Sequence, residues 1–294
     1  MARIGVIGAG RVGAVLSATL RRAGHDIVAA AGETDASRFR IETLLPGVPR
    51  LKPSAVARAS DVLLLTVPDD ALSNVVTMLS ASGAIREGMS VVHTSGAHGS
   101  AVLRPAAERG AHVAAMHPAM TFTGTDIDLA RLSGCVFGCT APEDPPARAL
   151  VDDLVADLGG RSFWIEEQHR VLYHAALAHG ANHLVTLVSQ SMELLRRSGV
   201  TDPAATLQPL LQAALDNSLS YGDAALTGPI VRGDLKTVRA HLGTLQETSL
   251  ETLESYIAMA RATANHAVLD GRLQPARAAV IVEALNDARV KAIR

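Results

Sequence analysis

The sequence predicts an α/β fold in which a doubly wound, mainly parallel sheet is followed by an all-α domain. Strand and helix patterns alternate through the first half of the chain. The run over 61–67 is almost continuously apolar, as expected of a strand buried on both faces. From residue 167 onward only helical patterns remain. These observations predict a first domain over 1–166 and a helical domain over 167–294.

The expected elements follow one another with short connections. Gly24, Gly199 and Gly271 stand where helices end, and Pro203 and Pro275 stand where helices begin. We expect strands at 4–7, 25–30, 61–67, 89–93, 111–116, 135–140 and 162–165. We expect helices at 14–22, 68–80, 146–158, 167–198, 203–221, 234–246, 249–270 and 275–293.

The composition limits the function classes. With 48% hydrophobic and 19% charged residues, the chain of 294 residues is long and apolar enough to bury a sizeable core. The net charge of −2 gives no electrostatic reason to expect nucleic acid or an anionic membrane as a partner. No apolar run approaches the ~18 residues of a membrane span, and the first strand begins at once, so we expect no signal peptide.

Two cysteines are the only ones in the chain, and they are four residues apart on an expected strand. Cys135 and Cys139 therefore share one face of that strand, which favours a core role. A metal or redox pair is the alternative, but no second cysteine pair completes a zinc site. This cysteine usage fits a reducing, cytoplasmic setting.

The most informative motif lies between the first strand and the first helix. Gly8-x-Gly10-x-x-Gly13 provides a tight turn, a close approach of the backbone to a pyrophosphate, and close packing of helix on strand. The helix N-terminus, which includes Arg11 and Val12, presents free N–H groups to the phosphates. We therefore predict a dinucleotide-binding Rossmann sheet; a glycine-rich turn of another α/β fold is the alternative.

The end of the second strand bears on which dinucleotide is bound. An acidic residue there binds the ribose 2′-hydroxyl of NAD, but this chain has Gly32 after an alanine run. Ser37 and Arg38, with Arg40 behind them, suit the 2′-phosphate of NADP. The prediction is NADP. NAD is the alternative cofactor, because Glu33 is an acidic residue just after the second strand. In that case Arg38 and Arg40 are ordinary exposed charges on a helix.

Ligands of such sheets bind beyond the carboxyl ends of the strands. Thr66, Val67 and Pro68 end one strand and are expected to line the nicotinamide half of the cofactor through backbone contacts. Ser95 follows the strand that ends at His93, and His117 ends the next one; both are candidate substrate-binding residues. The structural alternative is that such histidines cap or pack strand ends.

The expected helix over 167–198 is rich in histidine. His174 and Asn182 lie about 80° apart around the helix and are candidates to face one cleft. Because imidazole titrates near neutral pH, His174 is the candidate proton donor, with a packed or solvated histidine as the alternative. His179 and His183 have metal-binding spacing, but Gly180 follows where a metalloprotease helix has Glu, so no metal is predicted.

The stretch Thr227-Gly-Pro-Ile-Val-Arg-Gly-Asp234 joins two expected helices. Gly228 and Gly233 require a particular loop shape. Arg232 is a candidate bidentate clamp for a substrate carboxylate, and Thr227 a candidate substrate-binding residue. Asp234 is expected to cap the following helix.

Taken in order, the glycine motif, His93-Thr-Ser-Gly-Ala97, His117-Pro118, Tyr173-His174…Asn182 and the 227–234 stretch resemble the Rossmann-like proteins that carry the helical domain of unknown function 2520. That family is similar to pyrroline-5-carboxylate reductases, ketopantoate reductases, 3-hydroxyacid dehydrogenases and prephenate dehydrogenases. The resemblance implies an NADP-linked reductase whose helical domain often dimerises. Ketopantoate reductases and 3-hydroxyacid dehydrogenases use a lysine early in the first long helix of the second domain, about where His174 lies, and here no lysine occurs between Lys52 and Lys236.

Three hypotheses follow. In the first, the protein reduces a small keto acid, with ketopantoate as the most specific guess, and His174, Asn182 and Arg232 act respectively as proton donor, carbonyl-orienting residue and carboxylate clamp. In the second, the reduced bond is C=N, as in an imino acid of the pyrroline-5-carboxylate type. In the third, motivated by the missing lysine, the protein is a sensor or scaffold that binds NADP without turnover. Helices of the second domain, such as the one over 249–270, carry apolar residues at helical spacing. We expect part of this apolar surface to form a homodimer interface; an ordinary core face is the alternative.

Overall fold

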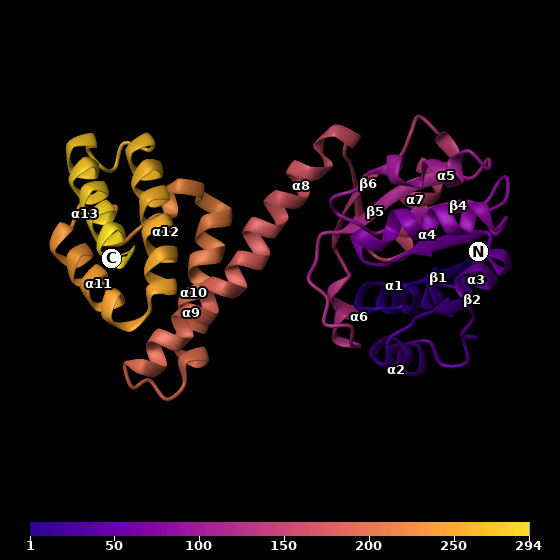
Figure 1. Cartoon of the computed structure of the whole chain (residues 1–294), viewed down its shortest axis with the longest axis horizontal. Coiled ribbons are helices and arrows are strands. Elements are labelled where there is room, and N and C mark those ends of the chain that lie inside the picture. The colour runs from indigo at the N-terminus through magenta and orange to yellow at the C-terminus, as the bar shows by residue number, and fades with distance from the viewer. Residues whose placement is uncertain (294) are drawn as a thin grey trace. The chain divides into compact units, whose positions relative to one another are not determined.

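The computed structural model describes residues 1–293, and the chain divides into two compact units (Figure 1). The first unit comprises Met1–Asn182, and the second begins at His183. Residues 167–182 thus belong with the sheet in this division. The domain limits of 1–166 and 167–294 stay a prediction from the sequence.

The first unit is built on a seven-stranded sheet with the order β2-β1-β3-β4-β5-β6-β7. Every neighbouring pair is parallel except β5 and β6. The strands are β1 (Arg3–Ile7), β2 (Asp26–Ala31), β3 (Val62–Leu65), β4 (Ser90–His93), β5 (His112–Pro118), β6 (Val136–Thr140) and β7 (Arg161–Trp164). The predicted mainly parallel α/β fold is confirmed. The carboxyl ends of β1, β3, β4 and β5 meet at one edge of the sheet.

Helices cover both faces of this sheet, as Figure 1 shows for α1 and α4. Successive side chains of β3 alternate between two cores: Val62 and Leu64 pack with α1 and α7, and Leu63 and Leu65 pack with α3, α4 and α5. The helices are α1 (Arg11–Arg22), α2 (Asp35–Leu44), α3 (Pro53–Ala59), α4 (Asp69–Ala81), α5 (Arg104–Ala107), α6 (Ile127–Arg131) and α7 (Pro145–Asp157). The short helices α3, α5 and α6 had no clear periodicity in the sequence.

The first unit ends in a helical segment that follows β7. The 3-10 turn η2 (Glu167–His169) leads into α8 (Arg170–Leu177), and α8 continues into the π-helical segment η3 (Ala178–Asn182). The stretch predicted to be helical over 167–198 is thus helical over 167–197, with a 3-10 turn at its start and a π-helical segment at η3. Wider π turns carry no periodic signal in a sequence and often occur at functional sites.

The second unit is entirely helical over its described residues. It consists of α9 (His183–Arg197), α10 (Pro203–Tyr221), the 3-10 turn η4 (Gly222–Ala225), α11 (Leu235–Thr248), α12 (Leu250–Leu269) and α13 (Pro275–Ile293). Its core joins α11, α12 and α13 through buried aliphatic residues that include Val238, Leu242, Leu253, Ile257, Ile281 and Leu285. Asp202, Asp234 and Ser249 cap α10, α11 and α12, so the predicted capping role of Asp234 is confirmed.

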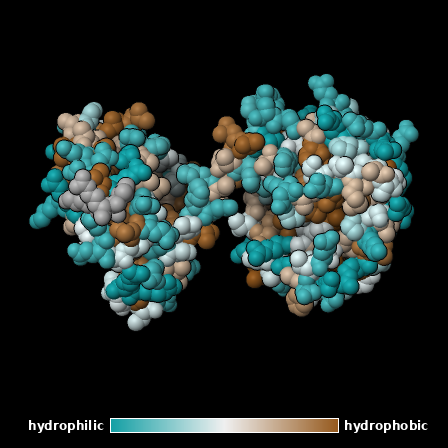
Figure 2. All heavy atoms as spheres, viewed as in Figure 1, coloured by the Kyte–Doolittle hydropathy of each residue, from teal (hydrophilic) through white to brown (hydrophobic). Residues whose placement is uncertain are grey.

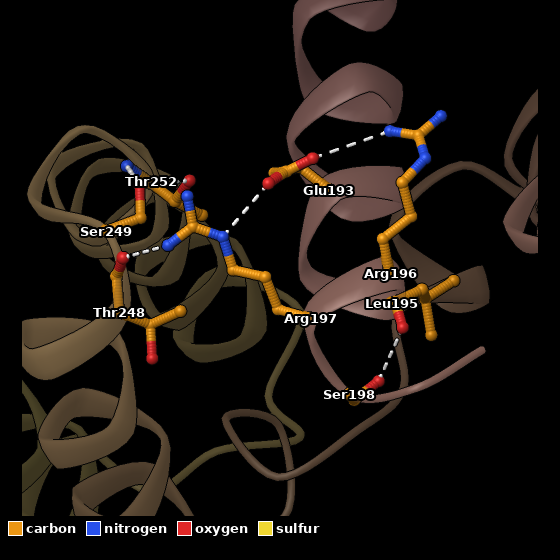
Figure 3. A network of polar contacts seen from close by, with 8 residues as sticks. All are labelled: Glu193, Leu195, Arg196, Arg197, Ser198, Thr248, Ser249 and Thr252. Atoms are coloured by element: carbon orange, nitrogen blue, oxygen red, sulfur yellow. Dashed lines mark hydrogen bonds and ion pairs between the residues drawn. The ribbon is translucent and has the colours of Figure 1, made fainter. Parts of the chain in front are cut away.

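Arg197 ties the end of α9 to the end of α11 (Figure 3). Its guanidinium donates to the Thr248 carbonyl oxygen and pairs with Glu193 at 3.0 Å. A cation at a helix C-terminus interacts favourably with the helix dipole, although this exposed pair contributes little stability by itself. No helix within residues 1–293 is both long and apolar enough to cross a membrane.

Candidate functional site

The glycine turn lies at the carboxyl end of β1 and has the features of a phosphate cradle. Gly8 has φ +95°, and a Cβ there would lie 2.7 Å from the Thr66 backbone. At Gly10 the nearest atom to a Cβ would be the Gly8 carbonyl oxygen, 3.7 Å away, so the space in front of Gly10 is open. No side chain caps the N-terminus of α1 at Gly10. The uncapped N–H groups beside open space fit the pyrophosphate of a dinucleotide.

Thr66 joins the end of β3 to this turn. Its hydroxyl donates to the Gly8 carbonyl oxygen at 2.7 Å. Gly13, on α1, leaves room for that hydroxyl, because a Cβ at Gly13 would collide with Thr66 Oγ1 and lie 2.8 Å from the Gly8 oxygen. Val67 and Pro68 follow directly, and Pro68 is the N-cap residue of α4. The structure thus brings the predicted cofactor residues of β1 and β3 together.

The predicted 2′-phosphate residues lie at the start of α2, after β2. Ser37 is buried, and its hydroxyl donates to the Thr34 carbonyl oxygen at 2.7 Å. Arg38 pairs with Asp35 at 3.1 Å. Arg40 takes another direction: its Nε would lie 2.5 Å from a Cβ at Gly124, and the same glycine lies against Arg11. Two guanidinium side chains, those of Arg11 and Arg40, therefore flank Gly124 next to the start of α1.

The loop that carries Gly124 is fixed by a buried carboxylate. Asp128 Oδ2 accepts hydrogen bonds from the N–H groups of Thr123 and Gly124, each at 2.7 Å, and from the Thr123 hydroxyl at 3.0 Å. Within the described part of the chain, neither Arg11 nor Arg40 has an acidic partner within ion-pairing distance. The loop beside Arg11 and Arg40 is thus fixed, and neither arginine is neutralised by a carboxylate among the described residues.

His93, at the end of β4, has a structural role. Its Nδ1 accepts the Ser95 N–H at 3.1 Å, and its Nε2 donates to the Gly99 carbonyl oxygen at 2.8 Å. The side chain is fully buried, and this burial lowers the pKa of His93 to about 4. A neutral imidazole with both nitrogens engaged fixes the loop after β4, which agrees with the structural alternative.

The residues predicted to contact substrate in the first unit meet around Gly96. A Cβ at Gly96 would lie 2.5 Å from His174 Cδ2 and 2.9 Å from His117 Nε2. The two imidazole rings are perpendicular within 8° and their centroids lie 5.9 Å apart. Ser95, the neighbour of Gly96, is buried, and its hydroxyl accepts the His98 N–H at 3.1 Å. The structure therefore assembles Ser95, His117 and His174 at the same edge of the sheet as the glycine turn.

Tyr173 joins this cluster through His117. The Tyr173 hydroxyl lies 3.0 Å from His117 Nδ1, and the two rings meet edge to face. Burial lowers the pKa of His117 to about 4, with further lowering by Arg170 and His174. Burial also raises the pKa of Tyr173, against the opposing effect of Arg170. Both groups are therefore neutral at physiological pH.

Arg170 lies beneath the cluster, almost completely buried. Its guanidinium donates to the Gly138 carbonyl oxygen at 2.8 Å and to the Ser95 carbonyl oxygen, and lies 5.5 Å from the Tyr173 ring centroid. Its Nε has no hydrogen-bond partner among the described residues, and no carboxylate among them lies within ion-pairing distance. Burying a cation without a paired anion destabilises the folded state, so an arginine in this position is unusual if its role is only structural.

Three side chains of η2 and α8 pack against glycines of the sheet unit. Tyr173 lies over Gly138, His174 over Gly96, and the Glu167 carboxylate over Gly99. Glu167 also accepts the Ser100 N–H at 2.8 Å and the Ala101 N–H at 3.3 Å, and so caps η1 (Ser100–Leu103). Sequence reasoning gave no role to Arg170 or Glu167 and quoted Tyr173 only as part of a motif. The sequence did contain one indication of these contacts: positions 96, 99 and 138 are glycines, which leave room for a side chain from another element to pack against the backbone.

The remaining predicted residues lie elsewhere. Asn182 is exposed at the end of η3, the last residue of the first unit. Thr227 and Arg232 belong to the second unit and are exposed in the loop before α11. Gly228 and Gly233 have φ of +96° and +69°, as the predicted loop shape requires. Ile230 and Val231 of this loop are buried in the core of the second unit. The roles of Asn182, Thr227 and Arg232 stay predictions.

Both cysteines are free thiols buried in the core between the sheet and α1 and α7. The core role predicted for Cys135 and Cys139 agrees with this position. Within residues 1–293, no three or more histidine, cysteine or carboxylate side chains gather in a way that would hold a metal ion.

Solved structures share this fold over nearly the whole chain. A protein described as an NADP oxidoreductase from Bacteroides fragilis is 20% identical and covers 90% of this chain and 98% of its own, with a TM-score of 0.77. A pyrroline carboxylate reductase from Plasmodium falciparum, solved with NADP bound, is 11% identical over 90% and 98% of the two chains, with a TM-score of 0.57. A reductive aminase from Aspergillus terreus, in complex with NADPH and ethyl levulinate, is 18% identical over 96% and 98%, with a TM-score of 0.66.

Family models match both halves of the sequence. No curated protein matches it. Residues 1–118 match the model of a Rossmann-like domain, and residues 135–263 match the domain of unknown function DUF2520. The second match begins in the sheet and includes Arg170, Tyr173, His174 and Arg232. The resemblance inferred from the motifs is confirmed, since the models of a Rossmann-like domain and of DUF2520 match the chain in the expected order.

Proposed function

We propose that the protein is an NADP(H)-dependent oxidoreductase that reduces a small keto acid, with a ketopantoate-like acid as the most specific candidate. One observation carries the proposal. An open, uncapped glycine turn and a cluster of histidine and tyrosine side chains lie along the same edge of one sheet. This edge is where α/β sheets bind their ligands. The NADP and NADPH named with the structures of similar fold support the choice of cofactor.

When bound, NADPH supplies a hydride to the carbon of a C=O or C=N group. The N–H groups at the start of α1, including those of Arg11 and Val12, bind the pyrophosphate beside Gly8, Gly10 and Gly13. The backbone of Thr66, Val67 and Pro68 lines the nicotinamide side. Ser37 and Arg38 are the proposed 2′-phosphate ligands, with Arg40, which has no acidic partner among the described residues, as a further cationic contact. NAD is the alternative cofactor.

A histidine of the cluster around Gly96 supplies the proton that completes the reduction, and the sequence assigns this role to His174. Ser95 and His117 contact the substrate from the same edge of the sheet. By their chemistry, Asn182 orients the carbonyl group, Arg232 binds the carboxylate and Thr227 contacts the substrate. The last three assignments rest on residue type and sequence position.

An imino acid is the second candidate substrate. It is favoured by the pyrroline carboxylate reductase and the reductive aminase among the structures of similar fold. A third candidate, an NADP-binding sensor or scaffold without turnover, follows from the absence of lysine between Lys52 and Lys236. The reductase reading has the advantage that it gives the cluster around Gly96 a chemical role.

The proposal includes a homodimer formed through the helical domain, in the cytoplasm. On α10, Leu210, Leu219 and Tyr221 are 65%, 79% and 67% exposed. On α9, Leu184, Val185 and Leu187 are also exposed. Figure 2 shows apolar residues among polar ones on one face of the molecule. Apolar side chains that gather on neighbouring helices are typical of a protein interface.

Purified protein tests the proposal directly. NADPH oxidation is followed by absorbance across a panel of 2-keto acids, which includes ketopantoate, and of cyclic imines, with NADPH binding measured separately by fluorescence. The first candidate is supported if wild type turns over a keto acid and the His174→Ala variant does so more slowly. Turnover of imines alone supports the second. NADPH binding without turnover of any member favours the sensor.

A further inference from the structure

The chain contains two histidine–tyrosine pairs with the same local geometry. His117 Nδ1 lies 3.0 Å from the Tyr173 hydroxyl, and His241 Nδ1 lies 3.0 Å from the Tyr256 hydroxyl. Both pairs of rings meet edge to face. The pairs differ in their surroundings, because only Tyr173 has a buried guanidinium, that of Arg170, below its ring. The Tyr256 pKa is raised by burial alone.

We propose that His117 and Tyr173 form a proton relay that delivers the proton of the reduction, and that Arg170 is the positioning residue that stabilises the relay. The inference rests on the proposed function and assigns its proton donor to His117 in place of His174. In the described part of the chain, Nε2 of His117 has no hydrogen-bond partner and lies beside Gly96, whereas Nδ1 faces the tyrosine hydroxyl. Nε2 can therefore donate its proton to a ligand at the site, and Nδ1 can accept the hydroxyl proton of Tyr173.

The His117 Nε2–H bond breaks and an O–H or N–H bond forms on the reduced substrate, whose hydride comes from NADPH. At the same time Nδ1 takes the proton of the Tyr173 hydroxyl, so His117 ends as the other neutral tautomer and Tyr173 as phenolate. A proton from solvent water then binds Nε2, while the Nδ1 proton returns to the Tyr173 phenolate, which restores the starting tautomer of His117 and the tyrosine hydroxyl. A neutral imidazole as donor has precedent among enzymes that work on carbonyl groups.

Arg170 explains why the phenolate is tolerable at a buried position. No carboxylate among the described residues lies within ion-pairing distance of its guanidinium, so its positive charge is available to Tyr173. Burial is the main reason why the pKa of His117 is lowered and the imidazole stays neutral. Arg170, His174 and His93 add to this effect, and Asp69 opposes it. Around Tyr173 the other titratable groups are the thiols of Cys139 and Cys135, which disfavour the phenolate.

The first test needs no turnover. Tyrosinate absorbance is titrated in the full chain, and the difference between wild type and Tyr173→Phe isolates Tyr173 from the other two tyrosines. In Arg170→Met the titration of Tyr173 moves up by about one pH unit or more, because an opposite charge near the ring is lost. Arg170→Lys keeps the positive charge, so in this variant Tyr173 titrates close to its wild-type position. The Lys variant also covers the case in which Arg170→Met does not fold. An unchanged titration in a folded Arg170→Met protein overturns the inference.

The second test is single-turnover NADPH oxidation with a substrate from the panel. Tyr173→Phe and His117→Asn slow this step by about 100-fold, the usual size of a lost proton transfer, and leave NADPH affinity within about twofold. The matched control Tyr256→Phe retains the wild-type rate. A larger loss in His174→Asn than in His117→Asn, or a Tyr173→Phe rate close to wild type, overturns the relay. If wild type reduces no substrate, the proposed function fails and the relay with it, whereas the tyrosine titration still decides whether Arg170 stabilises the Tyr173 phenolate.

Discussion

Thr66 and Gly8 are joined by a hydrogen bond of 2.7 Å from the threonine hydroxyl to the glycine carbonyl oxygen. The bond links residues 58 positions apart, at the ends of β3 and β1. It orients the glycine turn while leaving the first N–H groups of α1 without a side-chain cap. The turn is therefore held rigid by β3, and its free donors are presented at the edge of the sheet.

Two glycine substitutions separate binding from folding at this turn. Gly10→Ala adds a methyl group in open space, so we expect unchanged stability and at least about tenfold weaker NADPH binding, because the phosphate approaches there. Gly13→Ala places its methyl group on Thr66 Oγ1, and we expect a loss of about 1–3 kcal/mol of folding stability from overpacking. Thermal unfolding and NADPH fluorescence measure both effects. Full NADPH affinity in Gly10→Ala would show that the turn binds no pyrophosphate.

Arg38 and Arg40 provide a matched pair for cofactor choice. Arg38 is paired with Asp35, whereas Arg40 lies next to Arg11 across Gly124 and has no acidic partner among the described residues. We expect Arg40→Ala to weaken NADPH binding by about tenfold, the loss of one charge-assisted contact to phosphate, and Arg38→Ala to weaken it less. NADH binding should not change in either variant. Equal losses for NADPH and NADH would contradict a 2′-phosphate role.

The free energy of unfolding should decrease as the pH is lowered from about 6.5 to about 4, because of His93 and His117. Burial lowers the pKa of each to about 4 in the folded protein, whereas the unfolded chain protonates histidine near its ordinary value. The unfolded state therefore binds more protons in this interval, at a cost of up to about 1.4 kcal/mol per pH unit for each histidine. Urea unfolding across this range measures the slope. His93→Asn should flatten it, and an equally steep slope in that variant would contradict the assignment.

Glu167 and its neighbour Glu166 test the cap on η1. Glu167 accepts the N–H groups of Ser100 and Ala101. The Glu166 carboxylate is exposed and contacts only its sequence neighbours Gln168 and His169 among the described residues. Glu167→Ala should lower the free energy of unfolding by about 1–2 kcal/mol, as the loss of a cap does. Glu166→Ala should change it by less than about 0.5 kcal/mol. Similar effects in both variants would show that the cap is unimportant.

The exposed face of α10 should control oligomeric state. Leu219→Lys replaces a leucine that is 79% exposed and lies one turn from the exposed Leu215. We expect wild type to elute as a dimer in size-exclusion chromatography with light scattering, and Leu219→Lys to shift it toward monomer. Met78→Lys, on the exposed side of α4 in the first unit, is the control and should stay dimeric. A monomeric wild type would remove the dimer from the proposal.

Local patterns were sufficient for the architecture of this protein. The apolar run at β3, the glycine turn and the loss of strand signals after β7 predicted the sheet, its order of elements and the helical second half, because hydrophobic periodicity and turn residues are local properties. The π turn of η3 was missed, since nothing in residues 178–182 distinguishes it from regular helix. The predicted roles of His174 and Arg232 stay open, because they depend on what a ligand contacts.

The sequence by itself determined the fold class and placed a phosphate cradle at the end of the first strand. Only the tertiary structure decided which side chains surround Gly96. Arg170 contacts Ser95, 75 residues away, and Gly138, 32 residues away, and Tyr173 reaches His117 over 56 residues. Such contacts follow from how strands are ordered in a sheet and from where glycines let a helix approach. No periodicity records these features, and the buried charge of Arg170 became apparent only once its neighbours were known.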